Sequence, residues 1–285
     1  MKRIRVGDIV LDIELLGKGY LQETIPAYEV PIEGDAHHTI ESFMVDEIIV
    51  PNEDPRYQEP HKKLYSSENG EVIITFDPKN NHPIQRIEYD YQYRHVQLSF
   101  TDRYSQDLAE IEYLWTGILF FEIALLHGYS ALHASAIEYG HEAILFSAPS
   151  GTGKSTQARL WKTVYPQVET INDDKPLLKV EHGQVYVYGS PWSGKDLVNQ
   201  NAKVPLKAIV FLRQEGNNTI YPLTTQQKII ELYRNTYRPR ISKLAEINLS
   251  MMNQILPIVV IISYGCNMTL DAVFTLHNYL YGGTR

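Results

Sequence analysis

The chain has 285 residues, of which 44% are hydrophobic and 21% are charged, a composition typical of a globular protein with one large or two small domains. Its 26 basic and 34 acidic residues give a formal net charge of −8. This charge argues against a general nucleic-acid binder, because a phosphate backbone needs a basic surface. The single cysteine, Cys266, excludes an intramolecular disulfide, and no Cys/His cluster indicates a zinc site.

The sequence also argues against a membrane protein. Its longest apolar runs, near residues 118–126 and 255–262, are shorter than the about 20 residues that cross a bilayer. At the N-terminus, Asp8 comes before any apolar core of a signal peptide develops. We therefore expect a cytoplasmic protein without a membrane partner.

Residues 1–104 are predicted to form a β-rich N-terminal domain, in which short β-like runs alternate with turn-rich stretches. The predicted strands are residues 9–16, 43–50, 71–76, 86–93 and 95–100. His37 and His38 predict a solvated pair rather than a metal site, because neighbouring residues on a strand or loop point apart. With no catalytic motif, this domain is interpreted as a substrate-docking or assembly module.

The pattern changes at residue 105, where a second domain, 105–285, is predicted to begin. Apolar residues recur at helical spacing from 108 to 126 and predict a long helix that ends near Gly128. Beyond it, strands and helices alternate, which predicts an α/β fold with some antiparallel pairing. The predicted strands are 131–137, 143–147, 168–171, 176–180, 185–188, 207–213 and 258–263, and the predicted helices are 156–165, 224–237 and 269–281.

The strongest functional signal follows the strand at 143–147. Residues 148–155 read Ala-Pro-Ser-Gly-Thr-Gly-Lys-Ser, the phosphate-binding loop (P-loop, Walker A) pattern with Ala in place of the first Gly. Gly151 and Gly153 allow the backbone N–H groups to turn toward one point. Lys154 supplies a cation for the β- and γ-phosphates, and the hydroxyl of Ser155 is a ligand for Mg²⁺.

We therefore predict that this loop binds ATP with Mg²⁺. The alternative is a glycine-rich turn that binds nothing. The predicted nucleotide-binding residues are Ser150, Gly151, Thr152, Gly153, Lys154, Ser155 and Thr156.

Two adjacent carboxylates end the next predicted strand, in Asn172-Asp173-Asp174. Behind a phosphate loop, one carboxylate can hold Mg²⁺ or its waters while the other takes a proton from an attacking hydroxyl. The alternative is a solvated turn, which such triplets also favour. The Leu-Ser-Gly-Gly signature of ABC-type ATPases and the Asn-Lys-x-Asp motif of GTPases are both absent, which favours a kinase.

The segment 133–195 resembles the HPr kinase/phosphorylase catalytic domain. It is most similar to the HPr-kinase-like proteins of peptide-modification clusters, such as lasso-peptide kinases, a superfamily related to ATP-dependent phosphoenolpyruvate carboxykinase. The resemblance lies in Leu132-His133-Ala134-Ser135-Ala136, in the phosphate loop and in Asn172-Asp173-Asp174. It implies the P-loop core of that family, with Asp174 as the general base for a serine hydroxyl and Asp173 beside the metal. His133 and Lys154 would assist at the phosphates.

The chain departs from that family downstream. Bacterial HPr kinases have a Glu-x-Arg-Gly segment whose Glu ligates metal, but residues 188–195 here contain no acid. This stretch offers Trp192, hydroxyls and Lys195 for phosphate or substrate contact, or else it is a structural turn with Trp192 in the core. The candidates for neutralising charge on the γ-phosphate are Arg213, Arg234, Arg238 and Arg240, and the alternative for each is a surface charge, which the sequence favours.

These observations predict an ATP- and Mg²⁺-dependent kinase that phosphorylates a serine of a peptide or small protein. A homo-oligomer is compatible with the sequence. Two alternatives stay open: a nucleotide-sensing module with little transfer activity, and a kinase for a small molecule such as free serine.

Overall fold

The computed structural model describes residues 1–17, 19–103, 107–194 and 196–282. Contacts divide the chain into two compact units, Met1–Ile123 and Ala124–Arg285. The division falls inside helix α2 (Leu108–Leu126), whereas the predicted boundary precedes that helix at 104/105. Most of α2 belongs to the first unit because its buried carboxylates find partners there. Glu112 accepts a hydrogen bond from the backbone N–H of Leu16 (2.8 Å), and the Tyr93 hydroxyl donates to Glu122 (2.7 Å).

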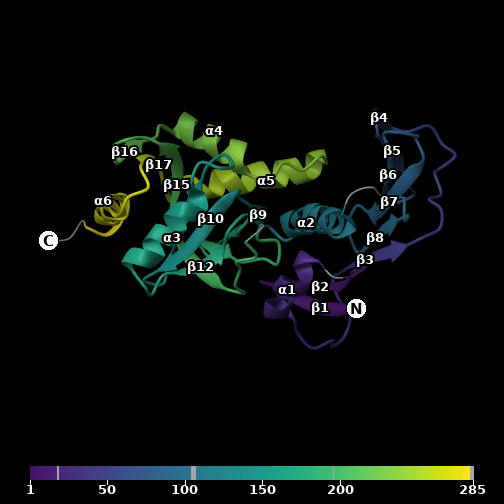
Figure 1. The fold of residues 1–285 in the computed structure, drawn as a ribbon, viewed down its shortest axis with the longest axis horizontal. Coiled ribbons are helices and arrows are strands. Elements are labelled where there is room, and N and C mark those ends of the chain that lie inside the picture. The colour runs from purple at the N-terminus through teal and green to yellow at the C-terminus, as the bar shows by residue number, and fades with distance from the viewer. Residues whose placement is uncertain (18, 104–106, 195, 283–285) are drawn as a thin grey trace. The chain divides into compact units, whose positions relative to one another are not determined.

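The first unit is built on an eight-stranded sheet in the order β1-β2-β3-β8-β7-β6-β5-β4 (Figure 1). The pairs β2/β3 and β3/β8 are parallel and the others are antiparallel. A short helix, α1 (Tyr20–Thr24), and a 3₁₀ turn (Ile25–Tyr28) lie between β2 and β3. The strands are β1 (Lys2–Val6), β2 (Ile9–Glu14), β3 (His38–Met44), β4 (Tyr57–Glu59), β5 (Lys62–Ser66), β6 (Gly70–Phe76), β7 (Pro83–Asp90) and β8 (His95–Phe100).

Two expectations for this region were wrong. Most of the strand predicted at 43–50 is not a strand: β3 ends at Met44, and a bend at Asp46 and Glu47 follows. His38 is buried rather than solvated, with its Nδ1 2.8 Å from the carbonyl oxygen of Tyr93, and burial lowers the pKa of its imidazole. His37 is exposed, as expected.

The second unit is a mixed sheet with helices on both faces (Figure 1). The strands are β9 (Ser130–Ala131), β10 (Ala134–Tyr139), β11 (Glu142–Ser147), β12 (Glu169–Asn172), β13 (Leu177–Glu181), β14 (Gln184–Tyr188), β15 (Lys203–Gln214), β16 (Thr219–Pro222) and β17 (Val260–Cys266). The helices are α3 (Lys154–Val164), α4 (Thr225–Asn235), α5 (Ser242–Ile255) and α6 (Leu270–Tyr281). Parallel β11, β15 and β17 form its centre, and β10 pairs antiparallel with β11. The predicted mixed α/β class is confirmed.

Strand β11 fixes the position of the loop that follows it. Successive side chains of a strand point to opposite faces, so Leu145 packs into the core that α4 and α5 cover. Ile144 and Phe146 pack into the other core, with Trp161 of α3 and Leu276 of α6. All of these side chains are fully buried. A strand buried on both faces reads as a continuous apolar run, which is why the sequence predicted it.

Helix α5 was not predicted, and Asn248 explains why. This polar residue lies on the buried face and interrupts the apolar periodicity. It is satisfied there, because the Ser130 hydroxyl donates to its Oδ1 (2.5 Å) and its Nδ2 donates to the carbonyl of Tyr237 (2.6 Å).

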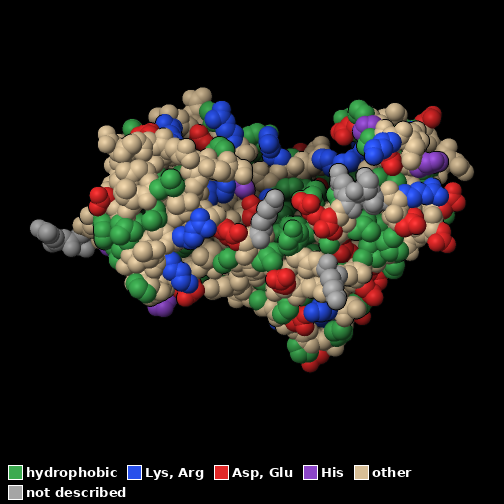
Figure 2. Space-filling view, in the orientation of Figure 1, with side chains coloured by type: hydrophobic (Ala, Val, Ile, Leu, Met, Phe, Trp, Pro, Cys, Tyr) green, Lys and Arg blue, Asp and Glu red, His purple; other side chains and the backbone are tan. Residues whose placement is uncertain are grey.

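The surface charges are mixed in sign. On the face that Figure 2 shows, acidic and basic side chains are interspersed rather than gathered by sign. Within the part of the chain that the structure describes, none of the helices combines the length and apolarity needed to cross a bilayer.

Candidate functional site

The P-loop connects the C-terminal end of β11 to the N-terminal end of α3. Gly151 and Gly153 adopt φ values of +77° and +117°, which favour glycine, and Gly153 is the N-cap of α3. The N-terminal end of that helix therefore adjoins the loop, where its dipole attracts an anion. On the neighbouring strand β15, Gln214 donates through Nε2 to the carbonyls of Gly151 (3.4 Å) and Thr152 (3.3 Å). Sequence reasoning did not identify this support from Gln214.

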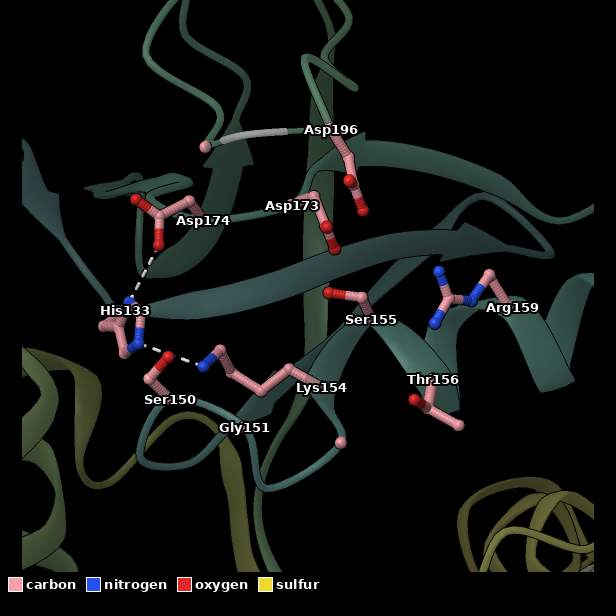
Figure 3. A pocket seen from close by; sticks show the side chains of 12 residues that line it. His133, Ser150, Gly151, Lys154, Ser155, Thr156, Arg159, Asp173, Asp174 and Asp196 are labelled. Carbon is pink, nitrogen blue, oxygen red and sulfur yellow. Dashed lines mark hydrogen bonds and ion pairs between the residues drawn. The ribbon is translucent and has the colours of Figure 1, made fainter. Parts of the chain in front are cut away.

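A pocket of about 320 Å³ lies on this loop (Figure 3). It gathers every residue predicted to be catalytic: His133 from the bend before β10, Lys154 from the start of α3, and Asp173 and Asp174 from the turn after β12. Of the predicted nucleotide-binding residues, Thr152 does not line it. The lining residues are His133, Ser150, Gly151, Gly153, Lys154, Ser155, Thr156, Arg159, Asp173, Asp174, Gly194 and Asp196.

His133 connects the two ends of a row of charged side chains. It lies in a bend between β9 and β10 rather than within the predicted strand, and its backbone N–H donates to the carbonyl of Asn235 (2.7 Å). Its Nδ1 is 3.0 Å from Asp174 Oδ1, and its Nε2 is 2.9 Å from Lys154 Nζ (Figure 3). Because an ammonium group only donates, we assign Nε2 as the acceptor and place the ring proton on Nδ1, facing Asp174.

The row holds Asp174 ionised. Burial by itself raises the pKa of this carboxyl, but the hydrogen bond from His133 and the nearby charge of Lys175 outweigh it and lower the pKa to about 2. Lys175 Nζ lies 2.8 Å from Asp174 Oδ2, so both carboxylate oxygens are engaged. At the other end, burial lowers the pKa of Lys154, and the charges of Asp174 and Asp173 oppose that shift. Lys154 is 8% exposed and also donates to the carbonyl of Ala148 (3.0 Å).

Asp173 belongs to a different side of the pocket. The fully buried hydroxyl of Ser135, on β10, donates to its Oδ1 at 2.6 Å. In Figure 3 the side chains of Asp173, Asp196 and Ser155 point toward a common region. Sequence reasoning missed Asp196, although an acid stands directly after the 188–195 stretch in which none is found.

The oxygen atoms of Asp173, Asp196 and Ser155 suit a magnesium ion. Two carboxylates and a hydroxyl are oxygen ligands, and Mg²⁺ usually takes one or two carboxylates and keeps several of its waters. Among the described residues, no group of three or more His, Cys, Asp and Glu side chains suited to a metal is present.

Asn172 ties the acidic turn to the segment that follows β14. Its Oδ1 accepts from the backbone N–H groups of Asp174 (3.0 Å) and Lys175 (2.8 Å). Its Nδ2 donates to the carbonyl of Ser190 (3.1 Å). Ser190 and Trp192 are 0% and 2% exposed, so this segment is a buried support and Trp192 is not a contact surface for nucleotide or substrate. Lys195 lies outside the described residues.

Replacing Asn172 by Ala is expected to destabilise the protein by about 2–3 kcal/mol, because it leaves buried polar groups unpaired. The measurement is the melting temperature of Asn172→Ala. The exposed Asn217→Ala variant is the matched control and should stay within about 0.5 kcal/mol of the unchanged protein. Equal melting temperatures for the two variants would show that Asn172 does not support the turn.

The arginine that lines the pocket is not one of the four predicted. Arg159 lies on α3, one turn after Ser155, and its guanidinium points toward the pocket (Figure 3). Arg213 instead lies over the ring of Tyr221, at 5.8 Å from its centroid, and Arg234 is 3.7 Å from Glu231. The spacing of four residues from Ser155 is the sequence signal that would have identified Arg159.

No family model matches the chain, and no curated protein matches it in sequence. Among solved structures, the HPr(Ser) kinase/phosphatase from Coxiella burnetii is similar at 16% identity, over 52% of this chain and 97% of that one, with a TM-score of 0.30. A likeness at this TM-score establishes neither a shared fold nor a shared activity.

Proposed function

We propose that this protein is a kinase that transfers the γ-phosphate of ATP to a hydroxyl group. The observation that carries the proposal is the row Asp174–His133–Lys154 in one pocket. It places a cation suited to phosphate at one end of a fixed imidazole and an ionised carboxylate at the other. A module that only binds nucleotide needs the cation and the loop, but has no use for a carboxylate on the opposite side.

The donor side is formed by the P-loop, residues 148–155. Its backbone N–H groups and Lys154 would hold the phosphates, with Thr156 and Arg159 beside them. Ser155, Asp173 and Asp196 would hold Mg²⁺. When bound, Mg²⁺ neutralises charge on the phosphate oxygens.

On the acceptor side, the hydroxyl oxygen attacks the γ-phosphorus, and the bond from that phosphorus to the β-phosphate oxygen breaks. The hydroxyl proton passes to Asp174, which gives up its contact with Lys175 to receive it. A carboxylate with a pKa of about 2 is a weak base, so its main contribution is to orient the hydroxyl. For the acceptor we propose a serine of a peptide or small protein, as the resemblance of residues 133–195 implies.

The proposal is tested by incubating the protein with ATP, Mg²⁺ and candidate acceptors. Mass spectrometry should show the gain of one phosphate on a serine-containing peptide or protein. Transfer to free serine alone would make it a small-molecule kinase. Binding of ATP without transfer to any acceptor would instead identify a nucleotide sensor, a reading favoured by the engagement of both Asp174 oxygens.

Replacing Asp196 by Asn is expected to raise the Mg²⁺ concentration for half-maximal activity about tenfold, because one of the two carboxylate ligands is lost. The measurement is transfer rate against Mg²⁺ concentration, with exposed Asp271→Asn on α6 as the control. An unchanged Mg²⁺ dependence would remove Asp196 from the metal site.

A further inference from the structure

The first unit carries a row of polar side chains across four neighbouring strands. Arg3 on β1 is in register with Asp12 on β2, Asp12 with Thr39 on β3, and Thr39 with His95 on β8. Residues paired in this way project to the same face of a sheet. The row lines a second pocket, of about 370 Å³, which no part of the proposed reaction uses. Its remaining lining residues are Asp35, Ala36, His37 and Arg94.

At one end of the row, Arg3 and Asp12 form a buried ion pair whose hydrogen-bonding groups are already engaged. Arg3 pairs with both carboxylate oxygens of Asp12 (Nε–Oδ1 2.7 Å, Nη2–Oδ2 2.8 Å). Its Nη1 donates to the carbonyls of Glu33 (2.6 Å) and Gly34 (2.9 Å), which fixes the loop that leads to the pocket wall. The side chains of Arg3 and Asp12 are 4% and 10% exposed. Their charges offset each other, and the pair has little left to offer a ligand.

A donor, the guanidinium of Arg94, lies beside the other end of the row. The Thr39 hydroxyl donates its one proton to the carbonyl of Arg94 (2.9 Å), so it accepts from Nδ1–H of His95 (2.9 Å). The described residues provide no hydrogen-bond partner for the guanidinium of Arg94. With Nδ1–H of His95 engaged, Nε2 of the neutral ring is an acceptor, so the donor at this end is Arg94. Both side chains are exposed at the pocket, together with that of His37.

We propose that this pocket binds a carboxylate-bearing ligand, with the carboxylate held by the guanidinium of Arg94 and the rings of His95 and His37 forming part of the pocket wall. A guanidinium matches a carboxylate with two parallel hydrogen bonds. The pocket has the volume of a site for a small molecule or a single peptide side chain. Asp12 and Asp35 line the same pocket, and their repulsion grows with the charge of the ligand. They disfavour a dianionic phosphate more than a monoanionic carboxylate.

The test uses the full-length protein with ¹³C-labelled histidine. Glutamate, a short acidic peptide and inorganic phosphate are titrated separately while the ring signals of His37 and His95 are followed by NMR. Saturable shifts with glutamate, the peptide or both are expected. Shifts with both indicate a pocket for a free carboxylate, and shifts with the peptide alone indicate one for an acidic side chain in a chain. Tighter binding of phosphate than of either would overturn the assignment, as would no saturable shift.

A charge variant tests the residue itself. Arg94→Gln is expected to raise the Kd for glutamate or the peptide about tenfold, and Arg94→Lys should recover part of that loss. Arg56→Gln, a change to an arginine outside the pocket with a single 3.5 Å contact to Glu71, is the matched control. Unchanged binding in Arg94→Gln would overturn the proposal. The Lys154→Met variant should bind the carboxylate normally, so this site is tested independently of the kinase activity.

Discussion

Replacing Lys154 by Met is expected to reduce phosphoryl transfer about 100- to 1000-fold and to weaken ATP binding. Lys154 is the cation of the P-loop, and its low exposure means that little water screens its charge. Met keeps the length and volume of the buried stem, so the loss reports the charge rather than a cavity. The measurements are the transfer rate with saturating ATP and the affinity for a fluorescent ATP analogue.

The matched control for this variant is Lys162→Met on the same helix. Lys162 is half-exposed and pairs at 3.4 Å with Glu169, an exposed ion pair of little consequence for stability. We expect it to transfer phosphate at the unchanged rate. If Lys154→Met binds ATP and transfers phosphate as well as Lys162→Met does, the phosphates are not held at residues 148–155.

The parts of the site that sequence reasoning predicted are those whose chemistry is local. The loop at 148–155 needs glycines at the positions of positive φ and a lysine at the start of a helix, and all of these lie within eight residues. Helix α2 and strand β11 were predicted because their burial produces clear apolar patterns. These features depend on neighbours in the chain, so they can be read from it.

The missed residues depend on contacts between distant segments. Asp196 and Asn172 are 24 residues apart in the sequence, and their roles arise because Ser190 and Asn199 contact the acidic turn at Asn172. Gly194, which lies between these two contacts, comes close to the side chain of Asp174. It has φ +82°, and a Cβ added there would lie 3.0 Å from the Cβ of Asp174. From the sequence alone, Gly194 indicates only a turn.

The first unit was harder to predict because its strands carry charge. In β1, Arg3 and Arg5 alternate with Ile4 and Val6, and these charged residues obscure a strand whose apolar side chains are buried. A buried Arg3 is tolerated because Asp12 faces it from the next strand and two backbone carbonyls accept from its Nη1. The register that brings Arg3 and Asp12 together is not visible in the sequence of either strand.

Replacing Asp174 by Asn is expected to lower phosphoryl transfer about 100- to 10,000-fold while ATP binding changes little. The amide keeps the shape of the side chain and can still accept from His133. It lacks the negative charge that orients the acceptor hydroxyl and cannot take its proton, and its NH₂ group would face the ammonium of Lys175 instead of attracting it. Because Lys175 is 37% exposed, it can turn to solvent without unfolding the turn.

Varying the Mg²⁺ concentration distinguishes the loss of Asp174 from the loss of the proposed metal ligand Asp196. Asp196→Asn acts through the affinity for Mg²⁺, so excess Mg²⁺ should restore its transfer rate, whereas no concentration of Mg²⁺ should restore Asp174→Asn. The pH dependence of the unchanged protein gives a second check. With its pKa lowered to about 2, Asp174 stays ionised as the pH falls from 7 to 5, so any acid loss of activity in that range must come from another group. If Asp174→Asn transfers phosphate at the unchanged rate with ATP bound, the proton goes elsewhere and the assigned role of Asp174 is wrong.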